Sequence, residues 1–325
     1  MDVSTTSVIR EQLVDRRQKL QAAVTQTGER TELTHLLREV DSALQRLDVG
    51  TYGHCELCRD PIEPDRLLAD PLARFCLDHL SPEEQRSLEQ DLELAARIQR
   101  GLLPDAHLNI DGWEIAYHYQ PARVVSGDYC DVIPSLDGGL YFMLGDVSGK
   151  GVAASMLMAH LQAMFRTLVP LELPLPALME RASRSFCEST LPTHYATLIS
   201  GRASASGEID VCNAGHLPIV VSTAAAPTLL TSSALPIGMF CSEQFKIRHL
   251  HLSRGETMVL VTDGVTETEN ADGLDYGIER VADVVHRNRT RPVGELIAES
   301  LRDVAAFAGA TRQADDVTML AIRRR

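Results

Sequence analysis

The sequence predicts an α+β protein whose larger part is a layered sandwich of antiparallel strands and helices. From Trp113 onwards, strand-like runs are separated by helices that come singly or in pairs, unlike the strict alternation of a doubly wound sheet. Before this region lie two leucine-rich stretches at helical spacing and two short cysteine-containing clips. We therefore expect a helical hairpin with a small zinc finger, followed by the sandwich.

The composition is that of a soluble globular protein, with 44% hydrophobic and 23% charged residues over 325 positions. Its net charge of −14 argues against nucleic acid as a partner, because no general basic field attracts phosphates. The first twelve residues lack the apolar core of a signal peptide, and the most apolar run, Val152–Phe165, is too short to cross a membrane. We expect a cytoplasmic protein with no membrane partner. Four scattered cysteines are expected to be buried and reduced: Cys130, Cys187, Cys212 and Cys241.

Residues 1–80 are expected to form one module. Apolar residues at helical spacing on either side of residues 27–30 predict an antiparallel helical hairpin that ends near Gly50. Cys55-Glu56-Leu57-Cys58 is followed, after seventeen residues, by Cys76-Leu77-Asp78-His79. Two such clips close a tetrahedral site for one Zn²⁺, and four protein ligands make that ion structural. The expected zinc ligands are Cys55, Cys58, Cys76 and His79, since the clip geometry favours His79 over the adjacent His54.

The segment around these clips, roughly residues 31–80, resembles the TraR/DksA-type zinc finger. The match is carried by residues 44–53, the first clip, Pro61-Ile62, Arg66-Leu67, Pro71 and residues 73–76, and His79 stands where family members usually have cysteine. In that family a longer coiled coil with an acidic tip reaches into RNA polymerase. The hairpin tip here, residues 25–30, carries one Glu and one Arg, so we expect a dimerisation, docking or sensing module.

Residues 81–108 are expected to form a linker helix. Ser81-Pro82 suits a helix start, with serine as the N-cap and proline in the first turn. Apolar and small residues then follow a heptad-like spacing as far as Leu102, and Pro104 ends the helix. Such a seam either packs on its own domain or pairs with a second chain in a homodimer, and the sequence leaves both open.

Residues 109–325 are expected to form the sandwich domain. The expected strands are 114–119, 129–133, 140–144, 196–200, 208–212, 219–221, 258–261 and 317–322. The expected helices are 152–168, 175–190, 277–287 and 293–307.

Two Gly-Asp pairs flank the expected hairpin of strands 129–133 and 140–144. Asp137-Gly138-Gly139 predicts the turn, because glycine accepts the positive φ that a hairpin needs. Asp128 and Asp146 each lie nine residues from Asp137, so an antiparallel hairpin places them opposite each other. Facing carboxylates repel unless one is protonated or a cation lies between them, and a hard divalent metal is the obvious candidate.

A second acidic pair follows the same logic. An apolar strand ends at Asp263, and Asp315-Asp316 opens the last strand of the chain. If these strands are antiparallel neighbours, their aspartates meet at one edge of the sheet. Four carboxylates at one rim require compensating charge, which two divalent cations would supply.

The same residues carry a resemblance to the SpoIIE-type branch of PPM (protein phosphatase 2C-like) phosphatases. The matching motifs, in order, are residues 127–131, 145–151, 213–218, 262–267 and 315–318, and residues 95–104 match the helix that precedes this domain in stress-response regulators. The resemblance implies a PPM-type α-β-β-α sandwich of two antiparallel sheets flanked by helices. It also implies two Mn²⁺ or Mg²⁺ ions as cofactors.

The resemblance further implies a role for each acidic residue. Asp146 would bridge the two ions and Asp128 would ligate one of them, with the backbone carbonyl of Val147 added. Asp263 and Asp315 would hold the other ion, with Asp316 as the fallback for Asp315. Asp131 would lie behind the ligands or hold a weaker third ion. Lys150, Asn213 and His216 are expected to shape loops.

The activity implied is hydrolysis of phosphoserine or phosphothreonine on a regulatory protein, of the anti-sigma-factor antagonist type, by a hydroxide activated between two metals. The zinc-finger module would control this enzyme. One alternative is a non-catalytic regulator that binds RNA polymerase or another partner through the zinc module and uses the phosphatase fold as a scaffold. Another is a redox or metal sensor in which zinc release from the cysteines changes the linker helix.

Overall fold

The computed structural model describes residues 3–27, 31–63, 66–67, 70–80, 82–105, 108, 110–191 and 193–325. The chain divides into two compact units, Met1–Asp91 and Leu92–Arg325, and the division falls inside helix α4, Pro82–Leu102. Ser81, the expected N-cap of this helix, and part of the expected hairpin tip, residues 28–30, lie outside the described residues.

The N-terminal unit contains the predicted helical hairpin, formed by α1 (Val3–Thr27) and α2 (Thr31–Asp48), and a 3-10 helix η1 (Leu77–His79). Ile9 and Leu13 of α1 and Val40 and Ala43 of α2 are fully buried in one cluster. The same cluster takes in residues of the metal-binding segment, including Cys55. The hairpin and the zinc finger therefore share a core.

Two five-stranded antiparallel sheets form the C-terminal unit. The first sheet has the order β1 (Trp113–Gln120), β10 (Val317–Arg324), β9 (Thr257–Val261), β6 (Ile219–Ser222) and β7 (Pro227–Leu230). The second has the order β2 (Asp128–Pro134), β3 (Leu140–Val147), β4 (Ala196–Ala203), β5 (Glu208–Ala214) and β8 (Arg248–His251). The α+β sandwich predicted from the sequence is confirmed.

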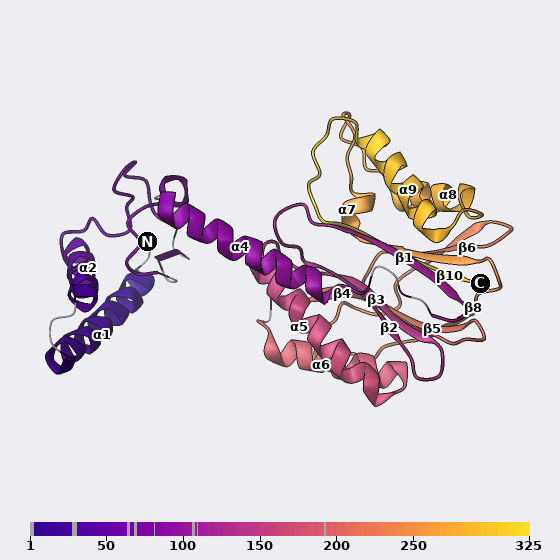
Figure 1. The fold of residues 1–325 in the computed structure, drawn as a ribbon, viewed down its shortest axis with the longest axis horizontal. Coiled ribbons are helices and arrows are strands. Elements are labelled where there is room, and N and C mark those ends of the chain that lie inside the picture. Colours follow the sequence, from indigo (N-terminus) through magenta and orange to yellow (C-terminus); the bar gives the residue numbers. More distant parts are fainter. Residues whose placement is uncertain are drawn as a thin grey trace. The chain divides into compact units, whose positions relative to one another are not determined.

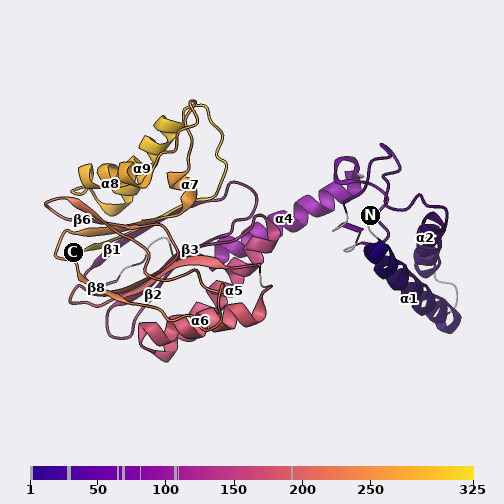
Figure 2. The same cartoon turned by 180° about the vertical axis from the view of Figure 1, so that it is seen from behind.

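Helices cover the outer face of each sheet (Figure 1). The second sheet carries α5 (Val152–Leu168), the 3-10 helix η2 (Val169–Leu171) and α6 (Leu175–Ser189), and the same arrangement is visible from behind in Figure 2. The first sheet carries α7 (Asp263–Thr266), α8 (Ile278–Arg287) and α9 (Val293–Ala308).

Side chains on the two faces of the strands pack in three separate hydrophobic cores. In β3, Leu140, Phe142 and Leu144 enter the layer between the two sheets, whereas Tyr141 and Met143 pack under α5 and α6. A third cluster joins the outer face of the first sheet to α8 and α9. Because β3 is buried on both faces, its sequence is a continuous apolar run rather than an alternating one.

The apolar segment Val152–Leu171 is longer than the sequence led us to expect. By length and composition alone it is able to cross a membrane. Within the structure, however, Ala154, Met158, Leu161 and Phe165 are buried, the last three of them in the core under the second sheet. One face of α5 therefore packs on the second sheet.

Strands β7 and β8 were not predicted. Both have only four residues and both lie at the edge of a sheet. Strand β7 begins with Pro227, and β8 reads Arg-His-Leu-His, with three of its four residues exposed. Proline and charge are typical of edge strands, and they remove the hydrophobic pattern from which a strand is recognised.

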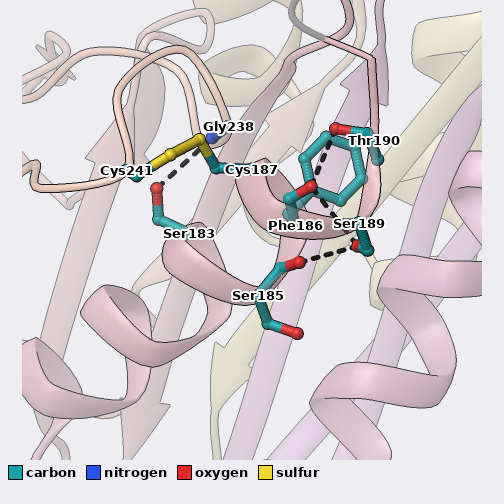
Figure 3. The surroundings of a disulfide bond; sticks show 8 residues. All are labelled: Ser183, Ser185, Phe186, Cys187, Ser189, Thr190, Gly238 and Cys241. Atoms are coloured by element: carbon teal, nitrogen blue, oxygen red, sulfur yellow. Dashed lines mark hydrogen bonds between the residues drawn. A yellow bond between two sulfur atoms is a disulfide. The ribbon is translucent and has the colours of Figure 1, made fainter.

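The expectation that Cys187 and Cys241 are free thiols was wrong. The two residues form a disulfide that joins the end of α6 to the segment between β7 and β8 (Figure 3). Their Cα atoms lie 5.4 Å apart, although 54 residues separate them in the chain. Cys130 and Cys212 are buried free thiols, as expected.

Candidate active site

The predicted pairing of Asp128 with Asp146 is confirmed. In the β2–β3 hairpin these two aspartates are directly opposite each other, as the last pair of the ladder. The turn contains Gly138 at φ 82°, and its backbone N–H donates to the carbonyl of Ser135 at 3.2 Å. The turn chemistry therefore fixes the register that brings the two carboxylates together.

Two threonines from the first sheet hold the Asp128 carboxylate. The hydroxyls of Thr262 and Thr318 donate to its Oδ2 at 2.9 and 2.5 Å, and all three side chains are buried. Thr318 was not singled out in the sequence, because its partner lies 190 residues away. These bonds connect the edge of the second sheet to the ends of β9 and β10, where Asp263 and Asp315 are located.

Asp263 and the Asp315-Asp316 pair meet at this edge. Strands β9 and β10 are antiparallel neighbours, and the N–H of Thr262 donates to the carbonyl of Thr318 at 3.0 Å. Gly264 packs so closely on the backbone of residues 315–316 that a Cβ atom there would collide with the carbonyl of Asp316. A glycine after Asp263 is therefore required to bring the two acidic segments into contact.

Asp315 and Asp316 have different surroundings. Both carboxylate oxygens of Asp316 accept backbone N–H groups, from Ala122 at 2.7 Å and from Gly127 at 3.0 Å. Asp315 instead faces the ammonium group of Lys150, whose Nζ lies 2.7 Å from its Oδ2. The other oxygen of Asp315 accepts the N–H of Asp316 at 2.9 Å. Asp316 therefore anchors the loop before β2, whereas Asp315 is paired with the partly exposed Lys150.

The acidic groups raise one another's pKa. Burial, opposed by the two threonines and supported by Asp146, raises the pKa of Asp128 well above its usual range. Burial together with Asp263, Asp315 and Asp316 raises the pKa of Asp146 to about 7. Without a cation, the ionised rim is therefore destabilised by desolvation and by like-charge repulsion.

These residues fit hard divalent cations. Oxygen-only donors suit Mg²⁺ and Mn²⁺, and a positive charge would relieve the repulsion just described. The carboxylates are spread more widely than the zinc ligands, which form the one set in the described residues whose ligand atoms all lie within 4.8 Å of one another. A wider spread suits ligands that are shared between two ions.

Three other residues of the matching motifs serve the fold. Asp131 is buried and paired through both oxygens with Arg166 of α5, at 2.6 and 2.8 Å, so the expected role behind the ligands or at a third ion is not supported. Asn213 Oδ1 accepts the N–H of His216, which fixes the loop after β5. The buried imidazole of His216 contacts the hydroxyl of Thr197 and the carbonyl of Val261, and burial lowers its pKa to about 4.

A cavity of about 950 Å³ adjoins the acidic edge. Lys150 and Asp315 line it together with Gly264 at the start of α7. Val304, Ala305 and Ala308 of α9 form an apolar part of its wall. Charged residues of both signs also line the cavity: Arg302, Arg312, Glu267, Glu269 and Asp275.

In the N-terminal unit, the structure brings the two clips together. The ligand atoms of Cys55, Cys58, Cys76 and His79 lie within 4.8 Å of one another. Cys76 Sγ is 3.8 Å from Cys58 Sγ and 3.2 Å from His79 Nδ1. Three sulfurs and one imidazole nitrogen at these separations fit around tetrahedral zinc, whose bonds to such ligands are about 2.0–2.3 Å.

Two models of known protein families match this chain, one in its C-terminal part and one in its N-terminal part. A family model described as Stage II sporulation protein E (SpoIIE) matches residues 136–325, which include Asp146, Asp263 and Asp315 but begin after Asp128. A model described as the prokaryotic dksA/traR C4-type zinc finger matches residues 50–78. That range includes the three cysteines and ends one residue before His79.

Several known proteins are similar to this chain over most of its length. Protein IcfG from Synechocystis sp. is 26% identical over 263 residues, which are 72% of this chain and 41% of IcfG. The chain thus spans about two fifths of that relative. Phosphoserine phosphatase RsbU from Bacillus subtilis is 22% identical over 246 residues, or 74% of this chain and 72% of RsbU.

Among solved structures, the SiaA-PP2C domain of Pseudomonas aeruginosa superposes with a TM-score of 0.67 at 21% identity. The match covers 76% of this chain and 100% of that domain, which shows a shared fold. Since the SpoIIE model covers more than half of the sequence, the chain belongs to the SpoIIE family.

Proposed function

We propose that the chain is a metal-dependent protein phosphatase that hydrolyses phosphoserine or phosphothreonine. The observation that carries the proposal is the edge-to-edge meeting of the hairpin aspartates, Asp128 and Asp146, with Asp263 and Asp315. Membership of the SpoIIE family and the likeness to RsbU, which is named a phosphoserine phosphatase, support this chemistry over other uses of an acidic site.

In this proposal, Asp146 would be shared by two Mn²⁺ or Mg²⁺ ions, Asp128 and the carbonyl of Val147 would hold one, and Asp263 and Asp315 would hold the other. Such ions supply an activated water and polarise the phosphoryl oxygens. The chain's own contribution is to fix the ligands. Thr262 and Thr318 occupy one oxygen of Asp128, which leaves the other oxygen to point at an ion. Asp316 is bound by backbone N–H groups and is no longer needed as a fallback ligand.

A polypeptide substrate is supported by the cavity beside the site. Its volume of about 950 Å³ lies at the upper end of the range for ligand sites, about 300–1,000 Å³, and a single phosphoserine side chain leaves most of it empty. Its apolar α9 wall and its charges of both signs suit the residues that flank a phosphoserine. We propose a regulatory protein of the anti-sigma-factor antagonist type as the substrate.

We also propose that the N-terminal module, residues 1–80, controls the phosphatase domain, residues 109–325, through the linker of residues 81–108. Helix α4 begins in one compact unit and ends in the other, which supports a connecting role. Gln99 of its heptad-like seam packs on the phosphatase domain, whereas Leu88, earlier in the seam, is exposed and provides a surface for a homodimer. The complete set of acidic residues favours catalysis over a scaffold that only binds RNA polymerase or another partner.

The activity is tested by hydrolysis of p-nitrophenyl phosphate as Mn²⁺ is titrated. Wild-type protein should show metal-dependent turnover, and Asp146→Asn should reduce kcat by at least about 100-fold, because the bridging ligand is lost. Asp137→Asn is the matched control, since Asp137 lies in the turn at the far end of the same hairpin, where its exposed carboxylate pairs with Arg202 and accepts the N–H of Gly139. Equal rates for wild type and Asp146→Asn would reject the proposed function.

A further inference from the structure

Gln99, near the end of α4, is buried and forms two hydrogen bonds with the backbone of another segment. The Gln99 side chain is 5% exposed. Its Nε2 donates to the carbonyl of Ser126 at 2.7 Å, and its Oε1 accepts the N–H of Ser126 at 3.0 Å. The amide of Gln99 therefore pairs with both the backbone N–H and the backbone carbonyl of Ser126, a residue 27 positions further along the chain.

The loop that Gln99 holds leads directly into the acidic site. The hydroxyl of Ser126 accepts the N–H of Asp128 at 3.0 Å, and Asp316 accepts the N–H of Gly127. Gly127 also packs on the neighbouring strand: a Cβ there would lie 3.1 Å from Oδ1 of Asp146. Residues 126–127 therefore contact both Asp128 and Asp146, whose backbones are already paired by the hairpin.

We infer that Gln99 is a positioning residue for the metal site, acting through Ser126 on Asp128. The inference rests on the proposed function, and it assigns a site role to a residue of α4 that touches neither metal nor substrate. An amide side chain is uncharged and offers a donor and an acceptor side by side, so it can pair with both the N–H and the carbonyl of one residue. Side chains that position metal ligands typically change metal affinity by about 10- to 100-fold when they are replaced.

Gln99 lies on the face of α4 that the heptad-like pattern of apolar residues defines. In the seam Leu88, Leu92, Ala95, Gln99 and Leu102, Gln99 occupies a position where an apolar residue is expected. A buried polar residue at such a position costs stability unless it is fully bonded. In this protein the nitrogen and the oxygen of its amide each have a hydrogen-bond partner, and both partners belong to Ser126 in the loop before Asp128.

The first test measures Mn²⁺ affinity by calorimetric titration, without turnover. Gln99→Leu keeps the side-chain size but leaves the N–H and carbonyl of Ser126 unpaired, so we expect Mn²⁺ to bind at least about tenfold more weakly. Glu114→Leu is the control: Glu114 also anchors a distant backbone N–H, that of Val293, but at the opposite end of β1. Unchanged affinity in Gln99→Leu, or an equal loss in Glu114→Leu, would overturn the inference.

A second test removes the Ser126 hydroxyl, which lies between Gln99 and Asp128 in the proposed route. Ser126→Ala removes the acceptor for the Asp128 N–H while leaving the backbone groups that bind Gln99. If both residues act on Asp128 along one route, the double variant should lose less Mn²⁺ affinity than the product of the two single losses. Strictly multiplicative losses would mean that Gln99 acts elsewhere.

Kinetics separates this inference from the proposed function. If Gln99 acts only through the metal site, saturating Mn²⁺ should restore kcat of Gln99→Leu for p-nitrophenyl phosphate to within about threefold of wild type. A kcat that stays low at saturating Mn²⁺ would contradict a role through metal affinity. Failure of the wild type to bind Mn²⁺ at all would instead reject the proposed function.

Discussion

At the scale of single residues, the site consists of carboxylates that the fold buries and places next to other negative charges. Asp128 is almost completely buried, yet one of its oxygens receives two hydroxyl hydrogen bonds. Asp146 faces it across the hairpin and has Asp263 and Asp315 as negative neighbours. This arrangement costs free energy in the metal-free protein, and divalent ions would recover that cost on binding.

Asp146→Asn should therefore stabilise the metal-free protein while it removes the response to metal. Because the pKa of Asp146 is raised to about 7, its ionised form opposes folding above that pH, and the cost fades as the pH falls towards 4. At pH 8 without metal, we expect the variant to gain about 1–3 kcal/mol of unfolding free energy in urea. Added Mn²⁺ should raise the Tm of wild type only. A variant less stable than wild type without metal would contradict this account.

His216 should make stability fall in acid. Its pKa in the folded protein is lowered to about 4 from 6.5, so the unfolded chain binds the proton more readily. Its contribution is complete above about pH 6.5 and is lost as the pH falls towards 4, by roughly 2–3 kcal/mol in total. The buried aspartates titrate with the opposite sign, so the measurement is the difference between wild type and His216→Gln in urea unfolding. Parallel pH profiles would show that His216 does not titrate as described.

At the scale of elements, the hairpin and the antiparallel strands were predictable and the contacts between them were not. Asp137-Gly138 and the apolar flanks determine the β2–β3 register from local sequence. The bonds from Thr318 to Asp128 and from Ala122 to Asp316 span about 190 residues, and no local pattern contains them. The same holds for the disulfide and for edge strands β7 and β8, whose short polar sequences carry no hydrophobic period.

Helix α9 should determine selectivity for polypeptide substrates. Ala305→Trp places an indole in the cavity, so KM should rise severalfold for a peptide with three residues on each side of phosphoserine. Hydrolysis of p-nitrophenyl phosphate should stay the same, because the small ester does not need the cavity. Ala306→Trp is the control, since Ala306 is exposed on the same helix and does not line the cavity. Equal effects of the two substitutions on the peptide would argue against the cavity as the docking site.

At the scale of the whole molecule, two units with separate cores carry the zinc-finger cluster and the acidic rim. The N-terminal core includes Cys55 and Cys76 together with apolar residues of α1 and α2, so a zinc ion bound by these cysteines would stabilise the helical hairpin as well. The C-terminal cores lie between and outside the two sheets, and the acidic rim is at their edge. The two zinc-binding clips could be predicted from the local spacing of their cysteines and histidine. The acidic rim as a whole could not be predicted from local spacing, because its residues come from separate segments of the chain.

Calorimetry should resolve these units. Removing zinc with a zinc-selective chelator, or replacing Cys76 with serine, should abolish or lower one melting transition, because structural zinc contributes directly to folding. The other transition should respond to Mn²⁺ and not to zinc removal. Loss of both transitions together on zinc removal would show that the two units do not fold independently.

The most direct test of the central claim is anomalous scattering from crystals grown with Mn²⁺. The account predicts two manganese peaks between the β2–β3 hairpin and the ends of β9 and β10, shared by Asp146 and contacted by Asp128, Asp263 and Asp315. Well-ordered crystals in which these four carboxylates point to separate places, with no manganese among them, would contradict it.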